Sequence, residues 1–110
     1  MNIQIFGKNK CFDTKKAERY FKERRIKFQR IDLIGVGISP GEFRSIKSAV
    51  GFEKMIDKSA EGAEILEYLA YQTDVEAKLL ENPAFLKTPI VRNGKKATVG
   101  YAPDVWKGWE

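Results

Sequence analysis

The spacing of apolar and polar residues divides the first third of the chain into a strand, a helix and a second strand. Residues 2–6 have the short apolar pattern of a strand, and residues 12–25 repeat apolar side chains every three to four positions, as an amphipathic helix does. Residues 28–33 then alternate apolar and polar side chains, which is typical of a half-buried strand. This order predicts a βαβ unit whose two strands are parallel. The buried face of the helix is predicted to consist of Thr14, Ala17, Tyr20 and Phe21.

The middle of the chain has the spacing of helices joined by short loops. Residues 39–42 (Ser-Pro-Gly-Glu) and 73–76 (Thr-Asp-Val-Glu) each predict a capping box at the start of a helix. Between them residues 65–70 predict a further helix, and Asn82-Pro83 ends the last one. The glycines of residues 35–41 are one residue off a dinucleotide-binding fingerprint and follow the second strand rather than the first. We therefore interpret them as the entry to the first of these helices.

The last third of the chain returns to strands. Residues 88–92 and 96–101 predict two strands, and Asn93-Gly94 between them predicts a type I′ hairpin turn. A short final helix follows, with Trp106 and Trp109 available to pack on the sheet. The complete order is β-α-β, a helical insertion, and β-β-α. It predicts an α/β, thioredoxin-like fold with a four-stranded mixed sheet.

Composition limits the classes of protein that need to be considered. The 110 residues, 43% of them hydrophobic, suit one domain over 1–110, with a core of 1–34 and 86–110 around the insertion 35–85. A single cysteine cannot form an internal disulfide, and no apolar run approaches the roughly 20 residues that span a bilayer. We therefore expect a soluble cytoplasmic protein without membrane contact. The absence of histidine excludes a Ser-His-Asp triad and a histidine-activated cysteine, and it argues against a metal site.

Positive charge is concentrated near the N-terminus. Residues 1–30 contain ten Lys or Arg and three Asp or Glu, whereas residues 31–110 contain ten and twelve. Much of this excess lies on the helix predicted over residues 12–25. It indicates either contact with nucleic acid or an acidic partner, or a solvated helix face. We favour the solvated face, because no aromatic-rich nucleic-acid motif accompanies the charge.

Cys11, the only cysteine, lies between the first predicted strand and the first predicted helix. Free N–H groups and the helix dipole favour a thiolate at such a position, and Lys8, Lys10 and Lys15 add positive charge. Thr14 lies one helical turn further on and can donate a hydrogen bond to the sulfur. The alternative is that Cys11 is a small buried hydrophobic residue, as many free cysteines are.

Several segments together resemble a known family. They are Ile5 to Cys11, Lys15 to Ala17, Asp32-Leu33, Asn82 to Val91 and Val99 to Tyr101. With them the chain resembles the arsenate reductase ArsC family, thioredoxin-fold proteins that include the Spx-type regulators. The resemblance implies that Cys11 is the nucleophilic thiol and that a cis Thr88–Pro89 bond lies beside it. It also implies that the backbone before this proline can pair with an extended thiol substrate such as glutathione.

The chain departs from the family where its active members bind arsenate. Those members hold the oxyanion with three arginines, and the corresponding positions here are Thr88, Asp57 or Lys58, and Tyr101 or Ala102. Arg92 and Lys58 are the candidate replacements, and Arg92 joins Thr88 and Pro89 as a candidate for binding substrate. Losing a bidentate guanidinium removes much of the affinity for an anion, so the resemblance argues against arsenate reduction here. Spx-type regulators often carry a CxxC redox switch. In this chain Thr14 stands at the position of the second cysteine, so an internal disulfide switch cannot form.

Two functions remain open. The first is a monothiol, glutaredoxin-like oxidoreductase that uses Cys11 and is resolved by an external thiol such as glutathione, with no bound cofactor. Its partner would be a small thiol or a redox partner protein. The second is an Spx-like regulator or protein-binding module that contacts RNA polymerase. In both cases we expect a monomer.

The helical insertion is expected to shape access to the thiol. We predict that residues 39–82 form a lobe on one side of the sheet, near Cys11. Residues 51–62, which have glycine near both ends, are the candidate mobile segment, and specificity is expected to depend on them.

Overall fold

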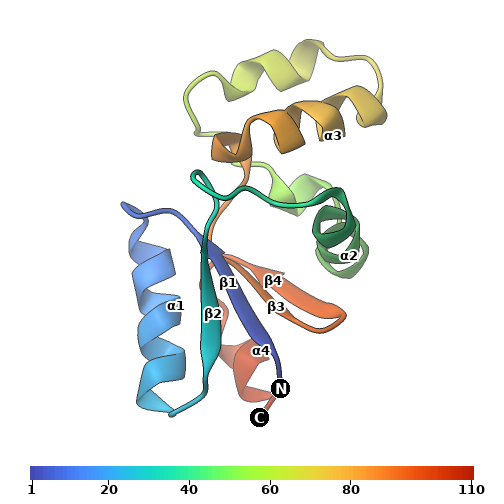
Figure 1. Ribbon diagram of the computed structural model, residues 1–110. Coiled ribbons are helices and arrows are strands. Elements are labelled where there is room, and N and C mark those ends of the chain that lie inside the picture. Colours follow the sequence, from blue (N-terminus) through green and yellow to red (C-terminus); the bar gives the residue numbers. More distant parts are fainter.

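A computed structural model describes residues 1–110 and contains the predicted βαβ unit, helical insertion and final hairpin with its helix (Figure 1). The regular elements are β1 (Ile3–Gly7), α1 (Phe12–Glu23), β2 (Phe28–Asp32), α2 (Pro40–Val50), α3 (Gln72–Glu81), β3 (Ile90–Asn93), β4 (Lys96–Val99) and α4 (Pro103–Lys107). Three short 3₁₀ helices, η1 (Glu53–Met55), η2 (Ala63–Tyr68) and η3 (Pro83–Phe85), lie within the insertion. The sheet order is β2-β1-β3-β4, with β1 and β2 parallel and the other neighbours antiparallel. The predicted α/β fold with a four-stranded mixed sheet is confirmed.

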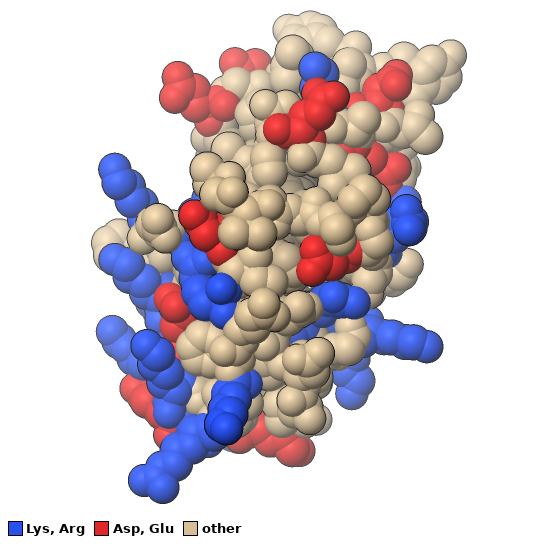
Figure 2. All heavy atoms as spheres, viewed as in Figure 1, with Lys and Arg blue, Asp and Glu red and all other residues tan.

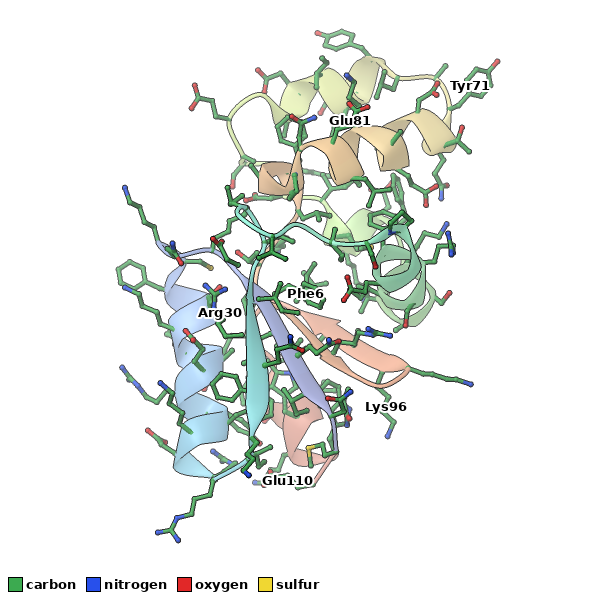
Figure 3. The ribbon with its side chains drawn as sticks, in the orientation of Figure 1. Phe6, Arg30, Tyr71, Glu81, Lys96 and Glu110 are labelled. Carbon is green, nitrogen blue, oxygen red and sulfur yellow. The ribbon has the colours of Figure 1, made fainter.

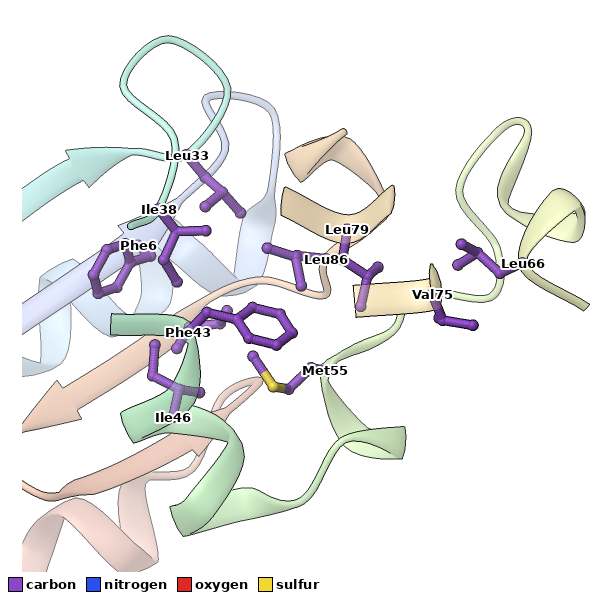
Figure 4. Close-up of a cluster of buried hydrophobic side chains, with 11 residues drawn as sticks. Phe6, Leu33, Ile38, Phe43, Ile46, Met55, Leu66, Val75, Leu79 and Leu86 are labelled. Atoms are coloured by element: carbon purple, nitrogen blue, oxygen red, sulfur yellow. The ribbon is translucent and has the colours of Figure 1, made fainter. Parts of the chain in front are cut away.

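Each face of the sheet carries its own hydrophobic core, because successive side chains of a strand point to opposite faces. On one face Ile3 and Ile5 pack with Tyr20 and Phe21 of α1 and with Trp106 of α4. On the other face the insertion packs on β1 and β3 (Figure 4). That cluster consists of Phe6, Leu33, Ile38, Phe43, Ile46, Met55, Leu66, Val75, Leu79, Leu86 and Ile90. The sheet is therefore covered by α1 and α4 on one face and by α2 and the rest of the insertion on the other.

Helix α1 is held against the sheet by its aromatic residues. Tyr20 and Phe21 each lie 5.2 Å from Trp106 between ring centroids, and Thr14 and Ala17 are also buried, as predicted. The indole N–H of Trp106 donates to Thr98 Oγ1 at 2.7 Å, so the buried tryptophan leaves no unpaired donor. Because α1 begins at Phe12 and its buried face is fixed, the position of Cys11 at its N-terminus is fixed too.

Sequence reasoning succeeds at one of the two predicted capping boxes. Ser39 Oγ accepts the N–H of Glu42 at 3.1 Å, and Glu42 Oε1 accepts the N–H of Ser39 at 3.0 Å. The second prediction is wrong: α3 begins at Gln72 with Tyr71 as N-cap and has no side-chain cap. The carbonyl of Tyr71 already accepts the first helical bonds, which leaves Thr73 inside the first turn. The helix expected over residues 65–70 is instead the 3₁₀ helix η2 over Ala63–Tyr68, which follows the left-handed Gly62 (φ 85°).

The hairpin turn is also displaced by one residue from its predicted position. Asn93 pairs with Lys96, so the two loop residues are Gly94 and Lys95. Gly94 has a positive φ of 61°, whereas Lys95 does not, and a type I′ turn needs a positive φ at both positions. The predicted type I′ turn is therefore wrong, and glycine at the first loop position is the pattern of a type II′ turn.

The centre of the segment 51–62 is tied to the chain that leads into β3. Asp57 N–H donates to the carbonyl of Phe85 at 2.7 Å, and Lys87 N–H donates to the carbonyl of Met55 at 2.8 Å. Ile56 and Leu86 form an antiparallel bridge between these bonds. Mobility of the whole segment, as the sequence suggested, conflicts with this pairing. Mobility stays a prediction only for residues 58–62.

Charge is divided between the two ends of the molecule (Figure 2). Lys and Arg side chains gather beside α1 and over the lower half of the view, and many Asp and Glu side chains lie over the insertion. Residues 51–82 contain eight Asp or Glu and three Lys, a balance of −5, and the rest of the chain carries +10. No helix combines the length and the apolar composition needed to cross a membrane.

Candidate functional site

Cys11 is the N-cap of α1 and is partly exposed. Its backbone is extended (φ −92°, ψ 116°), and its carbonyl accepts the N–H of Lys15 at 3.3 Å, within the first turn of the helix. Its own N–H donates to the carbonyl of Lys8 at 3.2 Å, which closes the loop between β1 and α1. The thiol therefore lies at the positive end of the α1 dipole, as the sequence predicts, and it is not part of either hydrophobic core.

The segment before β3 lies directly beside the thiol. The Thr88–Pro89 peptide bond is cis, as expected from the family resemblance. Cys11 Sγ lies 3.7 Å from the carbonyl oxygen of Thr88, to which the thiol donates. Thr88 and Pro89 are buried at this point, so the sulfur has protein on one side and solvent on the other.

Hydrogen bonds make the ionised form of Cys11 more favourable. Burial raises the pKa of the Cys11 thiol, but the hydroxyl groups of Thr14 and Thr88 lower it, and so do the backbone N–H groups of Thr14 and Asp13. The net effect holds the pKa below its ordinary value. The Thr88 carbonyl bonds to the neutral thiol, whereas the hydroxyl and N–H donors bond to the thiolate, so the site offers partners to both forms.

Thr14 is fixed in place for this role by close packing. It is buried, and its Oγ1 is the one buried side-chain N or O atom in the chain with no protein partner at hydrogen-bond geometry. A Cβ at Gly7 would overlap Thr14 Cγ2 and lie 2.9 Å from Oγ1. Gly7 therefore leaves the room that Thr14 occupies, and the Cys11 thiolate is the acceptor that its hydroxyl lacks.

Two of the lysines around Cys11 make contacts of their own. Lys8 Nζ donates to the carbonyls of Ala84 and Leu86, both at 2.8 Å, and lies 4.0 Å from Asp57 Oδ2. Lys8 therefore joins the loop before Cys11 to the insertion. The exposed side chains of Lys15 and Lys10 extend away from the core, and Lys15 lies over the ring of Phe12. The groups that lower the pKa of Cys11 are the hydroxyl groups of Thr14 and Thr88 and the N–H groups of Thr14 and Asp13. Stabilisation of the thiolate by the three lysines stays a prediction.

The two candidate replacements for the missing arginines lie in β3 and in the insertion. Arg92 pairs in register with Gln4, and its guanidinium donates to Gln4 Oε1 at 3.0 Å and to the carbonyl of Gly94. It lies four residues beyond Thr88, about 13 Å along a strand. Its guanidinium is thus bonded to neighbours in the sheet, and its part in binding substrate stays a prediction. Lys58 is exposed and lines two hollows of the insertion, one of which also includes Lys87, the residue before Thr88. A role for Lys58 in binding substrate stays a prediction. The site keeps hydrogen-bond donors for a thiolate, but no guanidinium to hold arsenate.

Arg30 is a supporting residue that sequence reasoning missed (Figure 3). Its Nη1 donates to the carbonyls of Ile31 at 2.6 Å and Gly7 at 3.4 Å, and its Nε lies 3.6 Å from Glu18 Oε1. It thus braces the end of β1 from which the loop to Cys11 departs. No sequence motif announces such a role, because its main partners are backbone carbonyls.

Comparisons with known proteins agree with this fold. The model of the ArsC family matches residues 6–109. An ArsC family related protein from Bacteroides fragilis is 18% identical, with a TM-score of 0.85 and 100% of both chains covered. An arsenate reductase from Vibrio cholerae is 21% identical, with a TM-score of 0.82 and coverage of 96% of this chain and 94% of that one. The glutaredoxin-like protein NrdH-redoxin from Escherichia coli is 18% identical, with a TM-score of 0.50 and coverage of 100% and 96%. No curated protein matches the sequence.

Proposed function

Because the chain belongs to the ArsC family, we propose that it is a thiol-dependent oxidoreductase in which Cys11 is the nucleophile. The observation that carries the proposal is the placement of Cys11: a partly exposed helix N-cap whose pKa is lowered by two hydroxyl groups and two backbone N–H groups. Reactive cysteines have such surroundings, whereas structural cysteines are buried among apolar side chains.

The absence of a second cysteine determines the kind of reaction. The Cys11 thiolate attacks the glutathione sulfur of a mixed disulfide, the S–S bond breaks, and the substrate thiolate leaves and takes a proton from water. Cys11 is then joined to glutathione through a new disulfide. A second glutathione thiolate attacks that glutathione sulfur, releases the Cys11 thiolate and forms oxidised glutathione, which carries away the two electrons.

The chain's own residues have separate parts in these steps. Thr14 and Thr88 donate to the sulfur each time Cys11 leaves as a thiolate, which makes it a better leaving group in the second step. The exposed side of Cys11 faces solvent and admits the substrate. The segment before Pro89 lies where an extended thiol substrate can pair with backbone.

A turnover assay with a glutathionylated peptide, reduced glutathione and a coupled glutathione reductase tests this proposal. Turnover is expected for the wild-type chain and its loss for Cys11→Ser, which should remain folded because Cys11 lies outside both cores. Turnover that is the same in both proteins would contradict the proposal. With arsenate as the oxidant we expect no activity above background, because uncharged Thr88 stands where active members have an arginine.

One observation favours a second function, that of a protein-binding module. The exposed residues of α1 include Lys15, Lys16, Arg19 and Lys22, a basic surface that none of the redox steps uses. An Spx-like contact with RNA polymerase would use such a surface on an acidic partner. Retention of RNA polymerase on the immobilised chain, with loss in Lys16→Glu/Arg19→Glu and not in Cys11→Ser, would support this function over the first.

A further inference from the structure

The insertion contains a pocket that the thiol chemistry does not use. It has a volume of about 270 Å³ and lies between the segment after α2, the helix η2 and the start of α3. Its apolar lining includes Phe52, Ile56 and Val75. Phe52 and Ile56 are only partly buried, so apolar surface remains open to solvent beside the insertion's core. Water in contact with such surface is released when an apolar group enters.

Three carboxylates line the pocket as well. Glu53, Glu64 and Glu67 are exposed, and none of them takes part in an ion pair or a side-chain hydrogen bond. Three other acidic side chains of the insertion are paired, Asp57 with Lys8, Glu76 with Lys47 and Glu81 with Lys78, whereas Glu61 and Asp74 are not. One lysine, Lys58, lines the pocket against the three carboxylates. The pocket thus offers an excess of negative charge around an apolar floor.

We propose that this pocket is a docking site for a basic segment of a partner protein, in which an arginine or lysine is flanked by an apolar residue. Arginine and lysine have apolar stems and charged ends, so one such side chain can cover the apolar lining while its charge meets the glutamates. The partly open Phe52 and Ile56 offer apolar surface for the flanking residue. The negative balance of residues 51–82 attracts a basic segment, although the whole chain is positive.

The pocket adjoins a hollow that reaches the segment before β3. It shares Glu53, Ile56 and Lys58 with a neighbouring hollow that also includes Lys87. Lys87 is the residue before Thr88, whose carbonyl accepts the Cys11 thiol. A partner segment docked in this pocket therefore lies near the residues that precede β3, and these residues lead to Cys11.

Binding of a fluorescein-labelled ten-residue peptide of alternating arginine and leucine, measured by anisotropy, tests the proposal. The protein carries Cys11→Ser, so the result does not depend on the proposed redox function. The key variant is Glu64→Gln/Glu67→Gln, and the matched control is Glu23→Gln/Glu81→Gln, which changes the net charge equally outside the pocket. Because exposed ion pairs contribute modestly to binding, we expect the key variant to bind about three- to tenfold more weakly and the control to stay within about twofold.

Two further probes identify the chemistry of recognition. A peptide with citrulline in place of arginine keeps the shape and loses the charge, and a peptide with serine in place of leucine keeps the charge and loses the apolar contact. Both are expected to bind more weakly than the parent peptide. If both double variants weaken peptide binding equally, the attraction comes from the overall charge rather than from the pocket, and the proposal is overturned. The absence of saturable binding up to about 1 mM peptide would overturn it as well. Self-association that Glu64→Gln/Glu67→Gln abolishes would overturn it too, because the pocket would then receive a second copy of this chain.

Discussion

Replacing Thr14 by valine tests the hydrogen-bonded thiolate at a single atom. Valine keeps both γ positions, so the packing of Thr14 against Gly7 is retained and only the hydroxyl group is lost. A hydrogen bond to a charged group is worth about 1.5–3 kcal/mol, and the partial exposure of Cys11 places this one at the lower end. About 1.4 kcal/mol corresponds to a tenfold change, so below the thiol pKa the thiolate fraction of the variant should fall about tenfold.

Two assays should report different sizes of this effect. Thiolate absorbance near 240 nm, followed against pH, reports the full change in ionisation. The rate of reaction with a disulfide changes less, because a thiolate of higher pKa is more nucleophilic. With a Brønsted slope of about 0.5, the tenfold loss of thiolate becomes a loss of roughly threefold in rate at neutral pH. An absorbance titration that Thr14→Val leaves unchanged would refute the role of the Thr14 hydroxyl.

Stability should respond to the same substitution with a definite sign. The pKa of Cys11 is lower in the folded chain than its ordinary value, so ionisation adds stability that is fully present above the unfolded pKa and is lost as the pH falls through the folded pKa. The unfolding free energy of the wild type minus that of Thr14→Val should therefore increase with pH across this window. At lower pH the variant should be at least as stable as the wild type, because it no longer buries an unpaired hydroxyl. A difference that is constant with pH would contradict the linkage.

Three further substitutions and measurements test the surroundings of the site. Lys8→Met should lower the free energy of unfolding by about 1–3 kcal/mol in urea titrations, because the bonds of Lys8 to two backbone carbonyls are lost. The absorbance titration of Cys11 should stay almost unchanged, because Lys8 does not bond to the sulfur. A large change in that titration would show that Lys8 is a partner of the thiolate. Gly7→Ala should lower the free energy of unfolding by about 1–3 kcal/mol, because its Cβ would overlap Thr14. An unchanged free energy would show that the Thr14 side chain can move aside without cost. In hydrogen exchange the amide of Asp57 should be protected like those of β3, and the amides of residues 58–62 should exchange faster; equal rates would contradict the pairing of Asp57 with Phe85.

The order of elements and the buried faces could be predicted because they depend on local patterns. The alternation of β1 and the spacing of Ala17 and Phe21 in α1 each follow from one side of an element being buried. The capping box at Ser39 was predictable for the same reason, since its partners are three residues apart. The box predicted at Thr73 failed because Tyr71 begins the helix two residues earlier, and competing starts of this kind differ little in free energy.

The nucleophile of the candidate site could be predicted from the sequence, but the polar residues around it could not. Cys11 is marked by its place between a strand and a helix, which the sequence shows directly. The contacts of Lys8 and Arg92 depend on which backbone carbonyls and side chains lie within reach after folding. Charge near Cys11 suggested Lys8 for the thiolate, and the family's missing arginines suggested Arg92 for the substrate. No sequence pattern marks the role of Arg30, because its partners are the backbone carbonyls of Gly7 and Ile31. Long-range contacts of single polar side chains are not encoded in a local pattern.

The most direct test of the central claim compares the folded chain with a peptide of residues 6–16, which contains the same cysteine without the fold. Both react with a glutathionylated peptide at neutral pH, and mass spectrometry follows the transfer of glutathione to Cys11. If the fold activates Cys11 through the helix N-terminus and the hydroxyl groups of Thr14 and Thr88, the folded chain should react several-fold faster, with the glutathione on Cys11. A folded chain that reacts no faster than the peptide would contradict the claim that Cys11 is an activated nucleophile.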